Sequence, residues 1–284
     1  MNFPSLVVFV ALAGGIALAQ PQPAPLSVVP LREGVYLVKG GSGANAGFIA
    51  GEKEVVVIDA KMTEASAREM LAEIRKVTPN PVRTLILTHS DGDHVNGLPG
   101  FPQGLRILAH ASTRKDMEAA IQTQNQTALA AYLPNETLTE SRRLSIGGVP
   151  MELLYFGPAH TSGDLIVLLP RQKIAFVGDL LFVGRDPLIH RQKGGSSTGL
   201  VNVLRRMLAL DADTFVSGHA DPLTKADIQA LLSSIEAKQA KVKALIGQGQ
   251  TLEQIKSAMG ETAAAGGRFP TLVDVIYQEL TANP

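Results

Sequence analysis

The chain has 284 residues, 45% of them hydrophobic, and a formal net charge of zero. This length and composition allow a large core in one or two domains, and the balanced charge indicates no basic face for nucleic acid. No cysteine is present. This excludes disulfides, thiol nucleophiles and thiolate metal ligands, so histidine and carboxylate side chains would have to hold any zinc ion.

The first 19 residues have the character of an export signal. Residues 1–19 contain no charged side chain, carry the apolar run Leu6–Ala13 and end in Ala17-Leu18-Ala19, which has the small-x-small form of a signal-peptidase site. Cleavage there would start the mature chain at Gln20, in the periplasm or outside the cell, with no stable membrane span. The alternative is an uncleaved anchor, although the apolar run is short for a span.

The chain after the leader begins with a proline-rich stretch and then alternates strands with a helix. Residues 20–30 are expected to form a flexible tail, and 31–284 to form a single domain with C-terminal helices. The run Val55–Ile58 predicts a strand, residues 63–77 have helical spacing, and Val82–Leu87 predicts another strand. Such a strand–helix–strand unit is typical of parallel pairing.

Two features of this half have two interpretations each. Asp59, which ends the strand at 55–58, either orients a metal-binding histidine from behind or only caps the following loop. The loop Gly40–Gly43, between strands expected at 35–38 and 46–49, is either a mobile hairpin tip or an edge of a substrate cleft.

The stretch Thr88–His94 follows the strand Val82–Leu87 directly and carries an unusual density of possible ligands. It holds two histidines and two aspartates in six residues: His89, Asp91, Asp93 and His94. Gly92 permits a tight bend, so that these side chains can converge on one point. A polar surface turn is the alternative, but three further residues downstream stand in matching settings. The pattern therefore predicts a metal site at the end of a strand.

The second half repeats this arrangement of strands that end in polar residues. Strands are expected at 106–110, 151–156, 165–169, 174–177 and 214–216, and helices at 113–132, 199–210, 225–246 and within 252–280. His160, Asp179 and His219 each follow one of these strands. Loops at one rim of a sheet commonly carry a functional site. His110, which ends the strand 106–110, is interpreted as structural.

Together these motifs resemble those of the metallo-β-lactamase superfamily of metal-dependent hydrolases. The usual first motif of that family, H-x-H-x-D-H, stands here as His89-Ser90-Asp91-Gly92-Asp93-His94. The later single ligands of the family match His160, Asp179 and His219, in the expected order. The similarity covers roughly residues 31–221 of the chain.

The resemblance implies an α/β fold: a four-layer αβ/βα sandwich of two mixed sheets with helices outside. It also implies two divalent metal ions in one site, most simply zinc, with iron or manganese as alternatives. By carry-over, one metal ion would be held by His89, Asp91 and His160, and the other by Asp93, His94 and His219. Asp179 would bridge them.

The motif departs from the family at Asp91, which stands where the middle histidine is usual. A carboxylate is still an accepted zinc ligand, and a harder oxygen ligand favours manganese or iron somewhat more. The added negative charge should weaken the usual bias toward anionic substrates. The alternative is that Asp91 turns away and leaves the first metal position incomplete.

The chemistry implied by the resemblance is hydrolysis by a metal-bound hydroxide. The substrate would be a small-molecule ester, thioester, lactone or lactam, and Asp93 would orient the attacking water or accept its proton. Asp179 disfavours an efficient β-lactamase of the cysteine-free subclass, and the leader disfavours a cytosolic glutathione thioester. His190, soon after Asp179, is a candidate substrate-binding residue.

Three other functions stay open. The first is β-lactamase-like activity as the main role. The second is a non-catalytic metal-binding or sensing module whose first metal position has decayed. The third is an iron-dependent dioxygenase relative. The sequence leaves the oligomeric state open.

Overall fold

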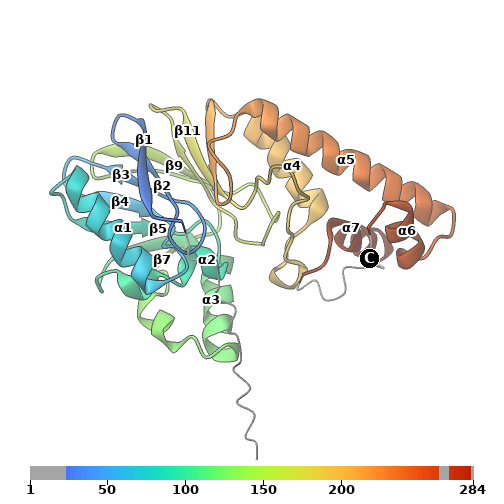
Figure 1. The fold of residues 1–284 in the computed structure, drawn as a ribbon, viewed down its shortest axis with the longest axis horizontal. Coiled ribbons are helices and arrows are strands. Elements are labelled where there is room, and N and C mark those ends of the chain that lie inside the picture. Colours follow the sequence, from blue (N-terminus) through green and yellow to red (C-terminus); the bar gives the residue numbers. More distant parts are fainter. Residues whose placement is uncertain (1–23, 262–268, 283–284) are drawn as a thin grey trace, which may run out of the picture.

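The protein folds as two β-sheets packed face to face, with helices on both outer faces (Figure 1). This arrangement is seen in a computed structural model that describes residues 24–261 and 269–282. It confirms the expected four-layer αβ/βα sandwich. The leader expected at residues 1–19 lies outside the described residues. No helix in the described part of the chain combines the length and apolar character needed to cross a bilayer.

The first sheet has seven strands in sequence order. Its strands are β1 (Ser27–Arg32), β2 (Val35–Lys39), β3 (Ala46–Ala50), β4 (Val55–Ile58), β5 (Val82–Ile86), β6 (Arg106–His110) and β7 (Glu136–Leu138). Strands β1 to β4 pair antiparallel, whereas β4 to β7 pair parallel. The strand–helix–strand unit predicted around residues 63–77 is therefore the start of the parallel half.

The second sheet has five strands in the order β12-β11-β10-β9-β8. They are β8 (Arg142–Ile146), β9 (Val149–Leu154), β10 (Ile166–Leu169), β11 (Ile174–Gly178) and β12 (Thr214–Ser217). All neighbours pair antiparallel except β11 and β12, which are parallel. The carboxyl ends of β11 and β12 therefore meet at one edge of this sheet.

Helices cover the outer face of each sheet. The α-helices are α1 (Glu64–Val77), α2 (Gly92–Val95), α3 (Ala111–Thr123), α4 (Ser197–Leu208), α5 (Lys225–Gly247), α6 (Leu252–Ala258) and α7 (Leu272–Thr281), and the 3-10 helices are η1 (Leu98–Gly100), η2 (Thr127–Tyr132) and η3 (Arg191–Lys193). Side-chain caps fix several helix starts: Thr63 accepts from the Ser66 amide at α1, and Ser196 accepts from the Gly199 amide at α4.

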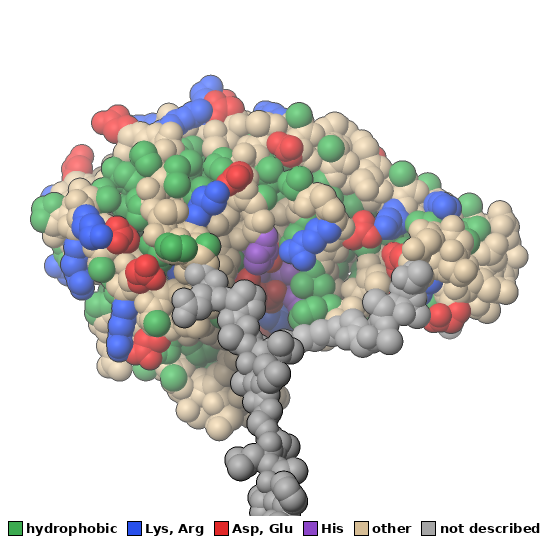
Figure 2. Space-filling view, in the orientation of Figure 1, with side chains coloured by type: hydrophobic (Ala, Val, Ile, Leu, Met, Phe, Trp, Pro, Cys, Tyr) green, Lys and Arg blue, Asp and Glu red, His purple; other side chains and the backbone are tan. Residues whose placement is uncertain are grey.

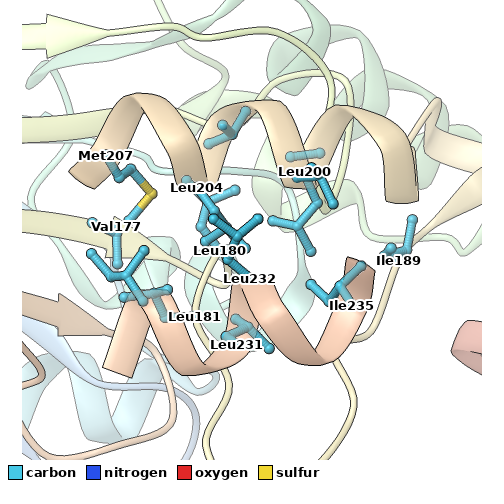
Figure 3. Close-up of a cluster of buried hydrophobic side chains, with 14 of the residues drawn as sticks. Val177, Leu180, Leu181, Ile189, Leu200, Leu204, Met207, Leu231, Leu232 and Ile235 are labelled. Carbon is cyan, nitrogen blue, oxygen red and sulfur yellow. The ribbon is translucent and has the colours of Figure 1, made fainter. Parts of the chain in front are cut away.

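Three apolar layers hold the sandwich together, because each strand sends alternate side chains to opposite faces. In β4, Val55 and Val57 pack toward α1, whereas Val56 and Ile58 pack between the two sheets. On the far face of the second sheet, Val177 packs among side chains of α4 and α5 (Figure 3). Figure 3 shows Leu200, Leu204 and Met207 of α4 facing Leu231, Leu232 and Ile235 of α5.

The structure corrects the sequence prediction at two edges of the domain. Residues 27–30, expected within a flexible tail, belong to β1, which pairs antiparallel with β2. Pro30 lacks an amide donor, and a strand on the edge of a sheet tolerates this. Residues 136–138, which are not among the strands predicted from the sequence, form β7 at the opposite edge of the sheet. Short edge strands have weak sequence patterns because only part of their surface is buried.

Candidate metal centre

Seven histidine and aspartate side chains meet where strands from both sheets end. They form two groups whose potential ligand atoms lie within 4.8 Å of one another: an inner group of His89, Asp91, His160 and Asp179, and an outer group of Asp93, His94 and His219. These are the seven residues that the sequence predicts as metal ligands. The structure brings all of them together, although they span positions 89 to 219.

The parallel strands explain why distant residues meet here. His89 follows β5, and a single turn of helix, α2, then points His94 back toward the strand ends. Asp179 follows β11, and His219 lies just beyond β12. Gly218 allows the close approach, because a Cβ there would lie 2.8 Å from His94 Cε1 and closer still to Asp179 Oδ1.

Asp59 settles one of the open questions, because it orients a histidine of the outer group. Its Oδ2 lies 2.7 Å from His94 Nδ1, and its Oδ1 accepts from the Thr88 amide at 2.8 Å. The side chain is buried, and the backbone of Asp59 has φ +60°. His94 Nδ1 therefore donates to Asp59, and Nε2 is turned toward Asp179 Oδ1, 3.1 Å away.

The two histidines of the inner group are fixed in the same tautomer. Thr88 Oγ1 has one proton, which it donates to Asp59 Oδ2 at 2.8 Å, so it accepts from His89 Nδ1 at 3.0 Å. His160 Nδ1 donates to the Leu188 carbonyl at 2.7 Å. Each imidazole thus turns Nε2 toward the centre of the site, where His89 Nε2 has no hydrogen-bond partner and His160 Nε2 lies 3.0 Å from Asp91 Oδ2.

Bare ligand atoms at this centre show that the residues fit metal ions. Within the described residues, His89 Nε2, His94 Nε2 and Asp179 Oδ1 are buried and have no hydrogen-bond partner. Buried polar atoms without a partner are rare, and lone pairs that face one another repel unless a cation lies between them. Imidazole nitrogen and carboxylate oxygen are ordinary ligands for zinc and related divalent ions.

The pKa values of the site indicate the same need for a cation. Hydrogen bonds to Asp179 and Asp93 raise the pKa of His219 to about 9. Burial lowers the pKa of His160, but its hydrogen bond to Asp91 and the charge of Asp179 outweigh burial and raise the pKa to about 9. Without metal ions, protons on His160 and His219 would supply the positive charge at neutral pH, so metal binding has to displace these protons.

A family model, described as the metallo-beta-lactamase superfamily, matches residues 40–219. The chain belongs to the metallo-beta-lactamase superfamily. The matched segment contains both ligand groups, from His89 to His219. The match confirms the resemblance predicted from the sequence motifs, which is to a superfamily of metal-dependent hydrolases.

Individual relatives share the fold at low identity. The chain is 28% identical over 207 residues to 2,4-dinitroanisole O-demethylase subunit alpha of Nocardioides sp., covering 72% of this chain and 61% of that protein. It is 26% identical over 181 residues to hydroxyacylglutathione hydrolase GloC of Haemophilus influenzae, covering 61% and 83%. A solved metallo-beta-lactamase from Pontibacter korlensis superposes with a TM-score of 0.63 at 20% identity, covering 75% and 99%.

Asp91, where this superfamily member departs from the usual motif, points into the site. Its Oδ2 lies 3.0 Å from His160 Nε2 and 2.8 Å from His190 Nε2, and its Oδ1 lies 2.7 Å from Lys193 Nζ. Burial opposes ionisation of Asp91, but hydrogen bonds from His160 and His190 hold its pKa far below the usual range. Asp91 therefore faces the other residues of the inner group instead of turning away from them.

Sequence reasoning missed Lys193 and Asp116. Lys193 Nζ also contacts Ser90 Oγ at 3.1 Å, and Ser90 Oγ donates to Asp116 Oδ2 at 3.1 Å. The sequence carries one signal that Lys193 lies near the site: it stands three residues after His190, in the same loop after Asp179. Nothing in the sequence marks Asp116, which lies on α3 and reaches the site only through tertiary packing.

A cleft of about 740 Å³ opens over the two groups. Figure 2 shows histidine and acidic side chains in a hollow of this face. His190 lines the cleft, and its side chain is 5% exposed. On one wall the Arg185 guanidinium lies over the Phe182 ring, 4.7 Å from its centroid, and Phe182 stacks on His219.

Of the remaining candidates, His110 lies outside both ligand groups, whereas the loop Gly40–Gly43 lies beside the outer group, because a Cβ at Gly43 would lie 2.6 Å from the Asp93 carbonyl oxygen. His110 is structural, as expected: its ring stacks on Tyr155 with centroids 4.0 Å apart, and Nδ1 accepts from the Ser112 amide at the start of α3. The loop Gly40–Gly43 is held in place rather than free at its tip, because the Ser42 carbonyl accepts from the Met62 amide at 3.0 Å. Met62 itself lines the cleft.

Proposed function

We propose that this protein is an exported metal-dependent hydrolase that cleaves a small-molecule ester, thioester, lactone or lactam. The observation that carries the proposal is the pair of ligand groups that share Asp179 at the floor of a cleft. Asp179 Oδ1 faces His94 Nε2 of the outer group, its Oδ2 faces His219 Nε2 at 3.0 Å, and the carboxylate also belongs to the inner group.

The residues present would hold two divalent cations, one in each group. When bound, such cations lower the pKa of a water molecule toward neutrality and polarise the bond to be broken. Zinc is the simplest candidate for this mixture of imidazole and carboxylate ligands, and iron or manganese are alternatives.

Asp93 is the group placed to move a proton. Its side chain is 28% exposed on the cleft side, whereas Asp179 is 4% exposed. Burial raises the pKa of Asp93, but the hydrogen bond from His219 and the charge of His94 outweigh burial and keep it below the usual value. An ionised carboxylate beside the reacting centre can orient a water molecule or accept its proton.

The cleft wall supports a small polar substrate. It is lined by amide side chains of Asn96, Gln124, Gln126 and Gln192, which can donate to or accept from carbonyl and hydroxyl groups. Arg185 adds a cation held over an aromatic ring, suited to an anionic group on the substrate. The volume of about 740 Å³ lies within the usual range for small-molecule sites.

Export is the further part of the proposal. It is supported by the uncharged leader and by Ala17-Leu18-Ala19 before Gln20. Amino-terminal sequencing of the protein from the periplasmic or secreted fraction tests this part alone. A mature start at Gln20 is the expected result, and a chain that keeps Met1 in the membrane fraction would contradict it.

The experiment that tests the hydrolase proposal is a metal-controlled substrate screen. Protein that begins at Gln20 would be assayed with zinc against aryl esters, thioesters, lactones, a chromogenic cephalosporin lactam and a nitroaryl methyl ether. Hydrolysis that disappears with a chelator and returns with zinc is the expected result. The His219→Asn variant should lose it, whereas the matched His110→Asn variant, outside the site, should retain it.

Two outcomes would contradict the proposal. Cleavage of the methyl ether alone would assign the protein a reaction outside the proposed set. Two bound metal ions without turnover of any substrate class would favour a non-catalytic metal-binding module instead.

A further inference from the structure

The Asp91 carboxylate contacts three side chains in the site. Lys193 binds its Oδ1, and His190 and His160 both lie within 3.0 Å of its Oδ2. The Asp91 side chain is 12% exposed and that of Lys193 is 25% exposed. An ammonium group held against a metal-ligating carboxylate changes both the charge and the geometry that a metal ion would meet.

Lys193 offsets the negative charge that Asp91 adds to the inner group. A neutral histidine at position 91, as in the usual motif, would add no charge to the site. Asp91 adds one negative charge, and Lys193, 2.7 Å from it, adds one positive charge. The three aspartates together with Lys193 thus carry the net charge of two aspartates alone. The expected weakening of the bias toward anionic substrates therefore does not follow from Asp91.

His190 serves this arrangement as a hydrogen-bond donor. Gln192 Nε2 lies 3.1 Å from His190 Nδ1, so Nδ1 accepts and the ring proton lies on Nε2, which donates to Asp91 Oδ2. His190 is not among the residues whose ligand atoms form the inner group. Its place is behind the Asp91 carboxylate, where it fixes the direction of Oδ2.

Backbone hydrogen bonds hold His190 and Lys193, two of the partners of Asp91, in one turn. The His190 amide donates to the His160 carbonyl at 2.8 Å, and the Ser162 amide donates to the Lys193 carbonyl at 2.9 Å. The 3-10 helix η3, Arg191–Lys193, connects the two side chains. Two backbone hydrogen bonds thus connect the loop that carries His160 to the turn that carries Lys193, the lysine that pairs with Asp91.

We propose that Asp91, Lys193 and His190 form one unit that replaces the middle histidine of the usual motif. Asp91 supplies the ligand oxygen at the first metal position, Lys193 cancels its added charge, and His190 fixes the carboxylate. This inference rests on the proposed metal dependence. Its consequence is that restoring the usual histidine alone should damage the site, because Lys193 would then face a cation without its carboxylate.

The test is a double-mutant cycle on metal affinity. The wild type, Asp91→His, Lys193→Met and Asp91→His/Lys193→Met proteins would be stripped of metal and titrated with zinc against a competing chelator. Bound zinc per chain is measured by elemental analysis. Titration with Co²⁺, followed by its visible absorption, reports the ligand set independently of activity.

The expected result is strong coupling between the two positions. Asp91→His should bind the first cation at least about tenfold more weakly than the wild type, and the double variant should return to within about threefold of it. The Lys193→Met protein should bind that cation at least as tightly as the wild type, because Asp91 still accepts the hydrogen bond from His190. Lys256→Met, whose lysine pairs with Asp274 elsewhere at 2.9 Å, is the matched charge control and should match the wild type.

Several outcomes would overturn the inference. An Asp91→His protein that binds two zinc ions as tightly as the wild type would show that Lys193 does not oppose a cation. A double variant no better than Asp91→His would show that the positions are not coupled. One zinc ion kept by the outer group shows that each variant is folded. A wild type that binds no metal would instead overturn the proposed function itself.

Discussion

The inner and outer ligand groups of this site use the same residue types but differ in how they meet solvent. In the inner group, the side chains of His89 and His160 are 1% and 0% exposed. In the outer group, His219 and Asp93 are 32% and 28% exposed. The two inner histidines are therefore buried supports, and a substrate in the cleft meets Asp91 and Asp179 of the inner group and Asp93 and His219 of the outer group. His94 of the outer group is as buried as the inner histidines.

Each group also has its own lysine. Lys193 pairs directly with Asp91 of the inner group in the cleft. Lys61 lies buried beside the outer group and donates to the Ala44 carbonyl. The two ligand groups thus obtain positive charge in different ways: one through an ion pair with a ligand carboxylate, the other through a lysine that hydrogen-bonds a backbone carbonyl.

Loss of Asp179 should have the largest effect, because this residue serves both groups. Asp179→Asn removes the charge that faces His94 and His219. We expect bound metal to fall below one ion per chain. The hydrolytic rate should fall on the order of a thousandfold, since metal ions supply several kcal/mol of stabilisation to such reactions. Elemental analysis and initial rates measure both effects, and retention of two ions with full activity would exclude a shared role for Asp179.

Lys61 should make stability depend on pH. Burial lowers its pKa from 10.5 to about 8, although the charges of Asp93 and Asp59 oppose this. Between these pH values the unfolded chain binds more protons than the folded one, so stability rises with pH. The cost of the buried ammonium, ~3 kcal/mol, is fully present below pH 8 and disappears above pH 10.5.

Urea unfolding of the metal-free wild type and Lys61→Met proteins measures this difference. The wild type should gain up to ~3 kcal/mol relative to the variant between pH 7.5 and pH 10.5. A difference between the two proteins that stays constant over this range would mean that Lys61 titrates normally in the folded state.

Asp59→Asn should weaken the outer group more than the inner group, because Asp59 contacts His94 directly and reaches His89 only through Thr88 Oγ1. Asp59 accepts from three donors, namely the Thr88 amide, Thr88 Oγ1 and His94 Nδ1, and an asparagine amide would turn a donor toward one of them. We expect the outer cation to bind about tenfold to hundredfold more weakly.

Asp164→Asn is the matched control for Asp59→Asn. Asp164 accepts from the Thr161 amide and from Thr161 Oγ1, beside His160, so its loss should spare the outer cation. Competition titration with a chelator distinguishes the two variants. Equal weakening of the outer cation in both would indicate a general loosening of the fold.

Gly218→Ala should have the smallest effect. The added methyl group would lie 2.8 Å from His94 Cε1, and overpacking of this kind costs about 1–3 kcal/mol. We expect thermal unfolding of the metal-free protein to shift down and the outer cation to bind more weakly. Gly247→Ala, where a Cβ would meet nothing within 4 Å, should do neither. A Gly218→Ala protein as stable as the wild type would mean that β12 can move away from His94.

The sequence determined the scaffold and the identity of the ligands. The strand at 55–58, the helix at 63–77 and the strand at 82–87 could be predicted because apolar periodicity is local. The motif Thr88–His94 could be recognised for the same reason, since its residues are adjacent in the chain. The helices near 199–210 and 225–246 were also predictable, and α4 and α5 lie at Ser197–Leu208 and Lys225–Gly247.

Only the tertiary structure decided which residues support the ligands. Asp59 and His94 are 35 positions apart, and Asp91 and Lys193 are 102 positions apart. No local pattern connects such pairs, because they meet only after parallel strands from two sheets bring their carboxyl ends together. The same packing placed His190 behind Asp91 and buried Lys61. Local periodicity therefore specified the elements and the ligand types, whereas long-range packing specified the charge balance and the hydrogen bonds of the site.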